Sequence, residues 1–233
     1  MPDRGRLVSR IRFTVSFLAV AVGAIALLHA CHSLSDDDIH PAGPSFFPLS
    51  VGNSWVFTAS ASRTARDSAI LETKDTLLID QKVIFQGRRY YRLRWTSWSG
   101  AQTDTWVYRD HIGNVHWADS PGSEGHRFLM FNAAVGDTWH TGREGCLDSL
   151  RMWDDYAVVE TPYGRFDGAQ EIGDIGHCLD FGWGVTTVRG IGPVRWTQVT
   201  IAGPIEWLLT DAQVHDDLSP TLSEKPLITN NGR

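Results

Sequence analysis

Residues 47–55 read FPLSVGNSW, and residues 131–139 read FNAAVGDTW. Both stretches follow the pattern F-x-x-x-V-G-[ND]-[ST]-W, in which the last five positions match chemically. A glycine followed by Asn or Asp and then by Ser or Thr favours a tight, hydrogen-bonded turn. We therefore expect the tryptophan after it to be the first inward residue of a β-strand. The residues of this motif are Gly52, Asn53 and Trp55 in the first copy and Gly136, Asp137 and Trp139 in the second.

A second motif lies downstream of each copy: residues 112–117 read IGNVHW and residues 191–196 read IGPVRW. The turn at the glycine is followed by a strand that places the valine and the tryptophan on one face. The motif residues are Gly113 and Trp117 in the first copy and Gly192 and Trp196 in the second. Both motifs recur in the same order at similar spacing, which predicts two related units of about 80 residues, at about 46–130 and 131–215.

The segments between the motifs alternate apolar and polar residues with the period of two that is typical of strands. Hairpin turns are expected near Gly87, near Ile112 and at residues 162–164, and a closing strand is expected over residues 205–215. Helical periodicity is not found over any long stretch. We therefore predict an all-β fold, a mainly antiparallel sheet or partly open barrel, in a β domain of residues 46–215.

The N-terminal segment is typical of a bacterial export signal. The last of four arginines is Arg12, residues 13–28 carry no charge, and Cys31 comes after His29 and Ala30. A membrane-spanning helix is the alternative, but this uncharged run is shorter than the roughly 20 residues that such a helix needs. We predict a signal peptide over residues 1–30 and lipidation, including palmitate, of Cys31. His29 is unusual for a lipobox, so plain secretion with cleavage nearby stays open.

Residues 31–45 include three consecutive aspartates and two prolines, which predicts a flexible tether, and a disordered tail is expected over residues 216–233. His32 and Ser33 lack the aspartate that holds well-studied enterobacterial lipoproteins in the inner membrane. That resemblance favours the outer membrane within the bacterial cell envelope. The expected membrane contact is the lipid anchor.

The chain after residue 30 carries 17 basic and 26 acidic side chains, a net charge near −9. An acidic surface repels a phosphate backbone, which argues against nucleic-acid binding. Apart from Cys31, the chain has two cysteines, Cys146 and Cys178. Because an even number of cysteines in an exported chain favours disulfides, we predict a disulfide between them. The alternatives are two unrelated buried thiols and a metal or redox pair, whose usual spacings this pair does not match.

The segment at residues 47–57 resembles the start of the mature domain in uncharacterised exported bacterial lipoproteins, which read P-L-x-x-G-N-x-W-x-Y. Residues 160–167, and residues 182–185 together with 190–194, are similar to further elements of the same group. The resemblance implies an antiparallel β domain and an envelope location. The family brings no established activity and no catalytic residues.

We recognise no catalytic, cofactor-binding or metal-binding motif in the sequence, and we assign no residue to any of these roles. His111 and His116, with Asp110 and Asp119 nearby, lack a recognised metal-ligand spacing. Ten tryptophans are the more informative signal. They could fill a β core, or they could line a concave sheet that holds an apolar or carbohydrate ligand.

Two hypotheses follow. The first is a non-enzymatic protein that binds an apolar or lipid-like ligand. The alternative is a structural or assembly component of the envelope that binds a protein partner through the same aromatic surface. An enclosed aromatic pocket favours the first and a flat exposed aromatic face favours the second, whereas a hydrolase would need His, Asp and Ser clustered in the pocket.

Overall fold

The computed structural model describes residues 44–61, 73–143, 145–176, 178, 181–201 and 203–215. The predicted signal peptide, Cys31, nearly all of the tether and the predicted tail lie outside these residues. No helix in the described part of the chain has the length and apolar composition needed to cross a membrane.

Twelve strands run through the described residues. Their bounds are β1 (Ser54–Ala61), β2 (Thr73–Phe85), β3 (Arg88–Thr96), β4 (Gln102–Arg109), β5 (Val115–Ala118), β6 (His126–Leu129), β7 (Thr138–His140), β8 (Ser149–Thr161), β9 (Gly164–Asp174), β10 (Phe181–Val188), β11 (Gly192–Thr200) and β12 (Gly203–Gln213). The expected hairpins lie where the sequence places them, with Gly87 between β2 and β3 and residues 162–163 between β8 and β9.

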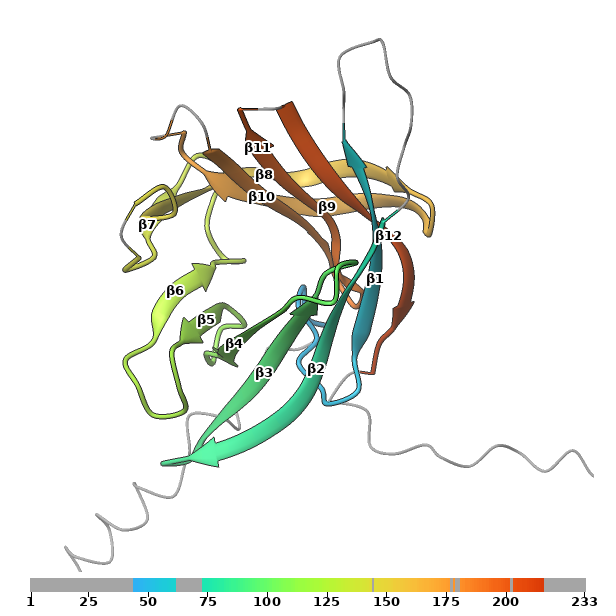
Figure 1. Cartoon of the computed structure of the whole chain (residues 1–233). Helices are drawn as coiled ribbons and strands as arrows, with labels where there is room; N and C mark the ends of the chain where they lie inside the picture. Colours follow the sequence, from blue (N-terminus) through green and yellow to red (C-terminus); the bar gives the residue numbers. More distant parts are fainter. Residues whose placement is uncertain are drawn as a thin grey trace, which may run out of the picture.

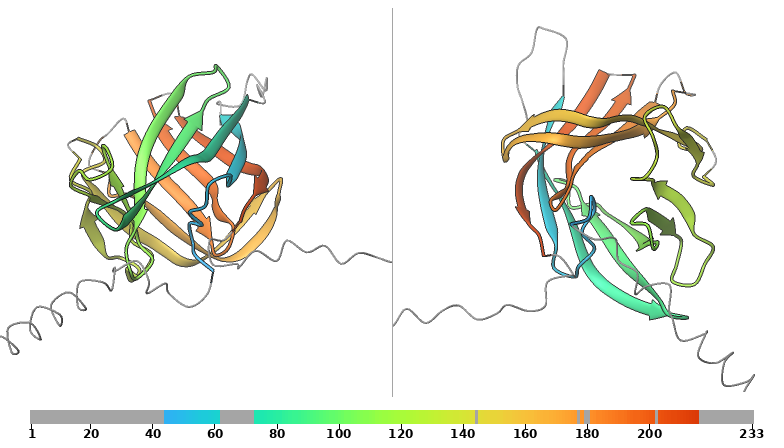
Figure 2. Two further views of the ribbon diagram at one scale, coloured as in Figure 1. Left: turned by 90° about the horizontal axis from the view of Figure 1, so that it is seen from below. Right: turned by 180° about the vertical axis from the view of Figure 1, so that it is seen from behind.

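All twelve strands form one antiparallel sheet in the order β6-β5-β4-β3-β2-β1-β12-β11-β10-β9-β8-β7. The order consists of two six-stranded meanders, β1–β6 and β7–β12, joined by the pairing of β1 with β12. The sheet curls on itself into a nearly closed barrel, with β6 and β7 as its two free edges (Figures 1 and 2). The predicted all-β, mainly antiparallel and partly open architecture is confirmed.

The first copy of the V-G-[ND]-[ST]-W motif joins its turn to the next strand. The Gly52 N–H donates to the carbonyl of Ile79 on β2 (2.8 Å), and the Ile79 N–H donates to the carbonyl of Asn53 (2.9 Å). Trp55 follows as a fully buried residue of β1, and its indole Nε1–H donates to the carbonyl of Ile191 (2.6 Å).

The second copy repeats these contacts. The Gly136 N–H donates to the carbonyl of Met152 on β8 (2.8 Å), and the Met152 N–H donates to the carbonyl of Asp137 (3.1 Å). Trp139 on β7 is buried, as its counterpart is on β1. The turn before β7 is therefore hydrogen-bonded to β8 in the same way as the turn before β1 is to β2.

The second motif also has the expected geometry in both places. Val115 on β5 and Val194 on β11 are fully buried. Trp117 and Trp196, two positions further along, lie on the same inner face as these valines because side chains alternate along a strand. Both tryptophans pack in or against the main hydrophobic core.

Gly192 is the motif residue that we expect to tolerate a side chain least. Its φ of 99° is unfavourable for other residues, and a Cβ there would lie 2.9 Å from the indole ring of Trp55. At Gly52 the φ is similar, 96°, but a Cβ would meet nothing within 4 Å. Gly192→Ala should therefore lower the free energy of unfolding by about 2 kcal/mol, and Gly52→Ala by about 1 kcal/mol. Urea unfolding followed by circular dichroism measures both, and equal losses would contradict the close approach to Trp55.

The two free edges are joined by side chains in place of a strand ladder. The Trp139 indole on β7 donates to the carbonyl of Phe128 on β6 (3.1 Å). The Trp117 indole on β5 donates to the carbonyl of Thr141, just after β7 (3.1 Å). One tryptophan from each repeated motif therefore holds the edges together.

Candidate functional site

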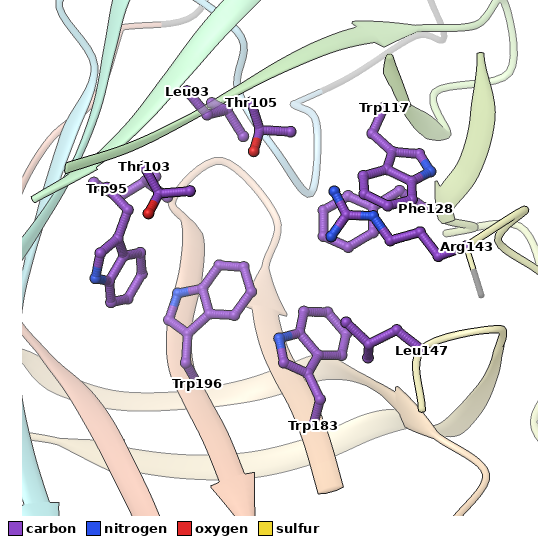
Figure 3. Close-up of a pocket in the computed structure, with 11 residues that line it drawn as sticks. Leu93, Trp95, Thr103, Thr105, Trp117, Phe128, Arg143, Leu147, Trp183 and Trp196 are labelled. Carbon is purple, nitrogen blue, oxygen red and sulfur yellow. The ribbon is translucent and has the colours of Figure 1, made fainter. Parts of the chain in front are cut away.

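An aromatic pocket of about 160 Å³ lies inside the curve of the sheet (Figure 3). Its lining comes from both units and is mainly apolar. The lining residues are Leu77, Leu93, Trp95, Thr103, Thr105, Trp117, Phe128, Arg143, Leu147, Trp183 and Trp196. A smaller cavity of about 20 Å³ shares several of these residues and extends toward Thr141 and Leu150.

Strand register builds the first wall. Trp95 on β3 lies opposite Leu77 on β2 and opposite Thr103 on β4, and Leu93 lies opposite Thr105. Since residues two apart on a strand share a face, all five side chains point to the same side of the sheet. The wall therefore consists of two adjacent rows of residues across three neighbouring strands.

Trp95 is oriented by a buried carboxylate. Asp75 is 3% exposed, and it accepts hydrogen bonds from the Trp95 indole Nε1–H (3.1 Å) and from the Trp98 backbone N–H (3.0 Å). The acceptors of Asp75 are thus used to fix one pocket residue and the turn that follows it. Such support reduces the rotamer freedom that a binding site would otherwise lose when a ligand binds.

The facing wall comes from the second unit. Trp183 on β10 and Trp196 on β11 have ring centroids 5.5 Å apart in an edge-to-face arrangement. Trp196 also meets Trp95 edge to face across the pocket (5.7 Å), which brings the two walls into contact at one end. Figure 3 shows these three indoles in a row, with Trp196 between Trp95 and Trp183.

The other end of the pocket lies at the joined edges of the sheet. Trp117 and Phe128 come from β5 and β6, whereas Arg143 and Leu147 come from the loop between β7 and β8 (Figure 3). That loop is held by Thr141, whose hydroxyl donates to the carbonyl of Leu147 and accepts from the Arg143 backbone N–H (3.1 Å).

A disulfide also holds this loop. Cys146 is bonded to Cys178 in the structure, with the two Cα atoms 5.5 Å apart. The bond joins the β7–β8 loop to the segment between β9 and β10. Cys146 is next to Leu147, so the cross-link directly restrains a residue that lines the pocket.

Arg143 is the charged residue of the lining. Although the residue as a whole is exposed, its guanidinium lies against the face of Trp117. Burial of that group lowers the pKa of Arg143, and Asp119 partly offsets the effect through space. An arginine with a lowered pKa is still a cation at neutral pH.

Some of the residues that the sequence motifs pointed to lie together at the pocket, and others lie elsewhere. Trp117 and Trp196, the last residues of the second motif, both line the pocket. Trp55 and Trp139 support the sheet around it, whereas Trp98 and Trp153 are exposed at 67% and 47%. The sequence interpretation missed Phe128, Arg143 and Leu147 as pocket residues. Phe128 alternates with exposed Arg127 on β6, a pattern that was visible in the sequence, but Arg143 and Leu147 lie in a loop without such a pattern.

Asp110 and His116 serve the turn between β4 and β5. The Asp110 carboxylate accepts from the backbone N–H groups of Ile112 and Asn114 and lies 3.0 Å from His116 Nε2. Within the described residues, no group of three or more His, Cys, Asp or Glu side chains is placed to hold a metal ion.

Asp110 should contribute to acid sensitivity. Burial alone would raise the pKa of this carboxyl, but the hydrogen bonds from His116 and Asn114 outweigh burial, so the pKa lies below its ordinary value. A carboxyl with a lowered pKa stabilises the fold above its unfolded pKa of about 3.9, and this contribution is lost as the pH falls through the folded pKa. When the pH is lowered from about 5 to about 2, the free energy of unfolding should therefore fall less in Asp110→Asn than in the parent chain. Urea midpoints measured across this range test the sign, and parallel curves would contradict it.

No family model matches the chain, and no curated protein matches it. Two solved structures are similar to it. One is a Bacteroides fragilis protein described as exported and as having a YmcC-like fold, with 11% identity and a TM-score of 0.46; the match covers 73% of this chain and 99% of that one. The other is a Parabacteroides distasonis protein described as a lipoprotein, with 12% identity, a TM-score of 0.44 and coverage of 74% and 100%. At these values neither likeness carries an inference about this chain's ligand or location.

Proposed function

We propose that this protein is a cell-envelope lipoprotein whose β domain binds an apolar ligand in the aromatic pocket. The observation that carries the proposal is the gathering of four tryptophans from four strands, Trp95, Trp117, Trp183 and Trp196, around one cavity. Sites for small molecules are typically concave and apolar, with a few polar groups that fix orientation. The polar groups in this lining are Thr103, Thr105 and Arg143.

The volume limits what the pocket encloses. A cavity of about 150 Å³ lined by apolar side chains is known to admit benzene, and this pocket measures about 160 Å³. It can therefore enclose one ring or a short acyl segment. A longer lipid-like molecule would have only one end inside, with the rest extending past the exposed Arg143.

The positions of the exposed tryptophans favour binding of a small ligand and not docking on an envelope protein. A docking role would place several of the ten tryptophans on one flat exposed face. The two exposed tryptophans, Trp98 and Trp153, lie on different units, in the β3–β4 turn and on β8. Docking on a protein partner stays the alternative, and binding experiments separate the two.

The envelope location rests on the sequence. We propose that Cys31 is acylated after removal of residues 1–30 and that the lipid anchors the domain, in the outer membrane more than in the inner. Cys31→Ser should move the exported protein into the soluble fraction, because the acyl chains supply the membrane affinity. A Cys31→Ser protein that stays in the membrane fraction after signal cleavage would contradict the anchor.

Filling the pocket should abolish binding. Thr103 lines the pocket, so Thr103→Phe should weaken the binding of a neutral ring such as indole by at least about tenfold by occupying the same space. Gln102→Phe adds the same bulk one residue earlier, on the opposite face of β4, and should leave the affinity unchanged. Isothermal titration calorimetry on exported Cys31→Ser protein measures both, with thermal unfolding to confirm that each variant is folded. If Thr103→Phe bound indole as tightly as the parent and Gln102→Phe do, binding in this pocket would be contradicted.

A further inference from the structure

Arg143, in the loop between β7 and β8, differs from three arginines on the strands in what surrounds it. Arg92 and Arg94 form ion pairs with Asp80 and Asp104, at distances from 2.8 Å, and Arg195 forms one with Glu171 at 3.1 Å. Among the described residues, no carboxylate forms an ion pair with Arg143. Its cation lies at the open side of an apolar pocket with an aromatic ring as its neighbour.

A second group in the pocket also lacks a partner. The indole Nε1–H of Trp196 is buried and has no hydrogen-bond acceptor among the residues that the structure describes. Both unpaired groups are donors, one of them charged. A buried donor without an acceptor costs free energy. Of the two donors, Arg143 is the one that a ligand can reach, because it is exposed, whereas the Trp196 Nε1 atom is buried.

We infer that the pocket selects an anionic amphiphile: an apolar body of about one ring or a short acyl chain inside, and a carboxylate or similar anion at Arg143. This inference rests on the proposed function and specifies the class of ligand. The planar guanidinium can donate two parallel hydrogen bonds to a carboxylate from its edge while one face stays on Trp117. The aromatic walls then accept the apolar body edge-on or face-on.

The site is preorganised for this role. The backbone of Arg143 is tied to Thr141, and the same loop is cross-linked by the disulfide at Cys146. These two contacts hold the backbone on either side of Arg143 before an anion arrives, and a fixed donor gives more affinity than a mobile one. Figure 3 shows the Arg143 side chain reaching inward below Trp117, across from the tryptophan row.

Matched pairs of ligands test the inference. The probes are 3-phenylpropanoate and its amide, and hexanoate and its amide, titrated calorimetrically into the exported Cys31→Ser chain at low salt. We expect each carboxylate to bind at least about tenfold more tightly than its amide, because hydrogen bonds to charged groups are the stronger ones. The phenyl and acyl pairs show which apolar body the walls prefer.

Three variants test whether Arg143 causes the preference for the carboxylate over its amide. Arg143→Gln should remove the preference for the carboxylate over the amide, and Arg143→Lys should retain part of it. Arg127→Gln removes an exposed cation from β6, the strand that carries Phe128, so it should leave the preference intact. Equal affinities of acid and amide in the parent, or a preference that survives Arg143→Gln, would overturn the inference but not the proposed function. Failure of all four probes to bind would instead count against the proposed function itself.

Discussion

Trp55→Ala is expected to lower the free energy of unfolding by about 3 to 5 kcal/mol, which is a large part of the stability of an ordinary domain. Trp55 is fully buried on β1, between β12 and β2 at the junction of the two meanders. The substitution leaves a large cavity beside Phe47 and removes the indole donor from the Ile191 carbonyl. Urea unfolding followed by far-ultraviolet circular dichroism measures the loss.

Trp98→Ala is the matched control. Trp98 is two-thirds exposed, so the same truncation should change the free energy of unfolding by no more than about 0.5 kcal/mol. Similar losses in the two variants would contradict the central position given to Trp55.

Removing the disulfide should produce the second large effect. In the chain-entropy description, a bond that closes a loop of 32 residues contributes roughly 3 kcal/mol, so the double change Cys146→Ser and Cys178→Ser should lose about that much. Because the bond restrains the loop that carries Arg143 and Leu147, ligand affinity should fall as well. Chemical unfolding and calorimetric titration of the double variant test both effects.

Reduction of the parent protein is the corresponding control. A reducing agent should lower stability and affinity in the parent and leave the double variant unchanged. Equal stability of the oxidised parent and the double variant would show that the bond does not constrain the folded domain.

Local features were predictable from the sequence because local chemistry decides them. The turn at Gly52 and Asn53 follows from the conformations these residues prefer, and the inward position of Trp55 follows from the period of two. The same reasoning placed the β2–β3 turn at Gly87. Nothing local predicts that β1 pairs with β12, because that contact joins residues more than 140 positions apart.

The sequence predicted an aromatic concavity as one of two possibilities, but it did not predict which residues line the pocket. Ten tryptophans suggested either a core or an aromatic concavity, and alternation places Trp95 on the face of Leu93. Which tryptophans meet depends on how the two units curve toward each other. Arg143 could not be foreseen as a pocket residue, because its position depends on the contacts of a loop and not on strand periodicity.

The measurement that tests the account most directly is a titration of the ¹⁵N-labelled exported Cys31→Ser protein with 3-phenylpropanoate, followed by the indole N–H signals in two-dimensional NMR. Each of the ten tryptophans gives one such signal. The account predicts shifts for Trp95, Trp117, Trp183 and Trp196 and stationary signals for Trp98 and Trp153. Shifts confined to the exposed pair, or none at all at millimolar ligand, would contradict an aromatic ligand site inside the sheet.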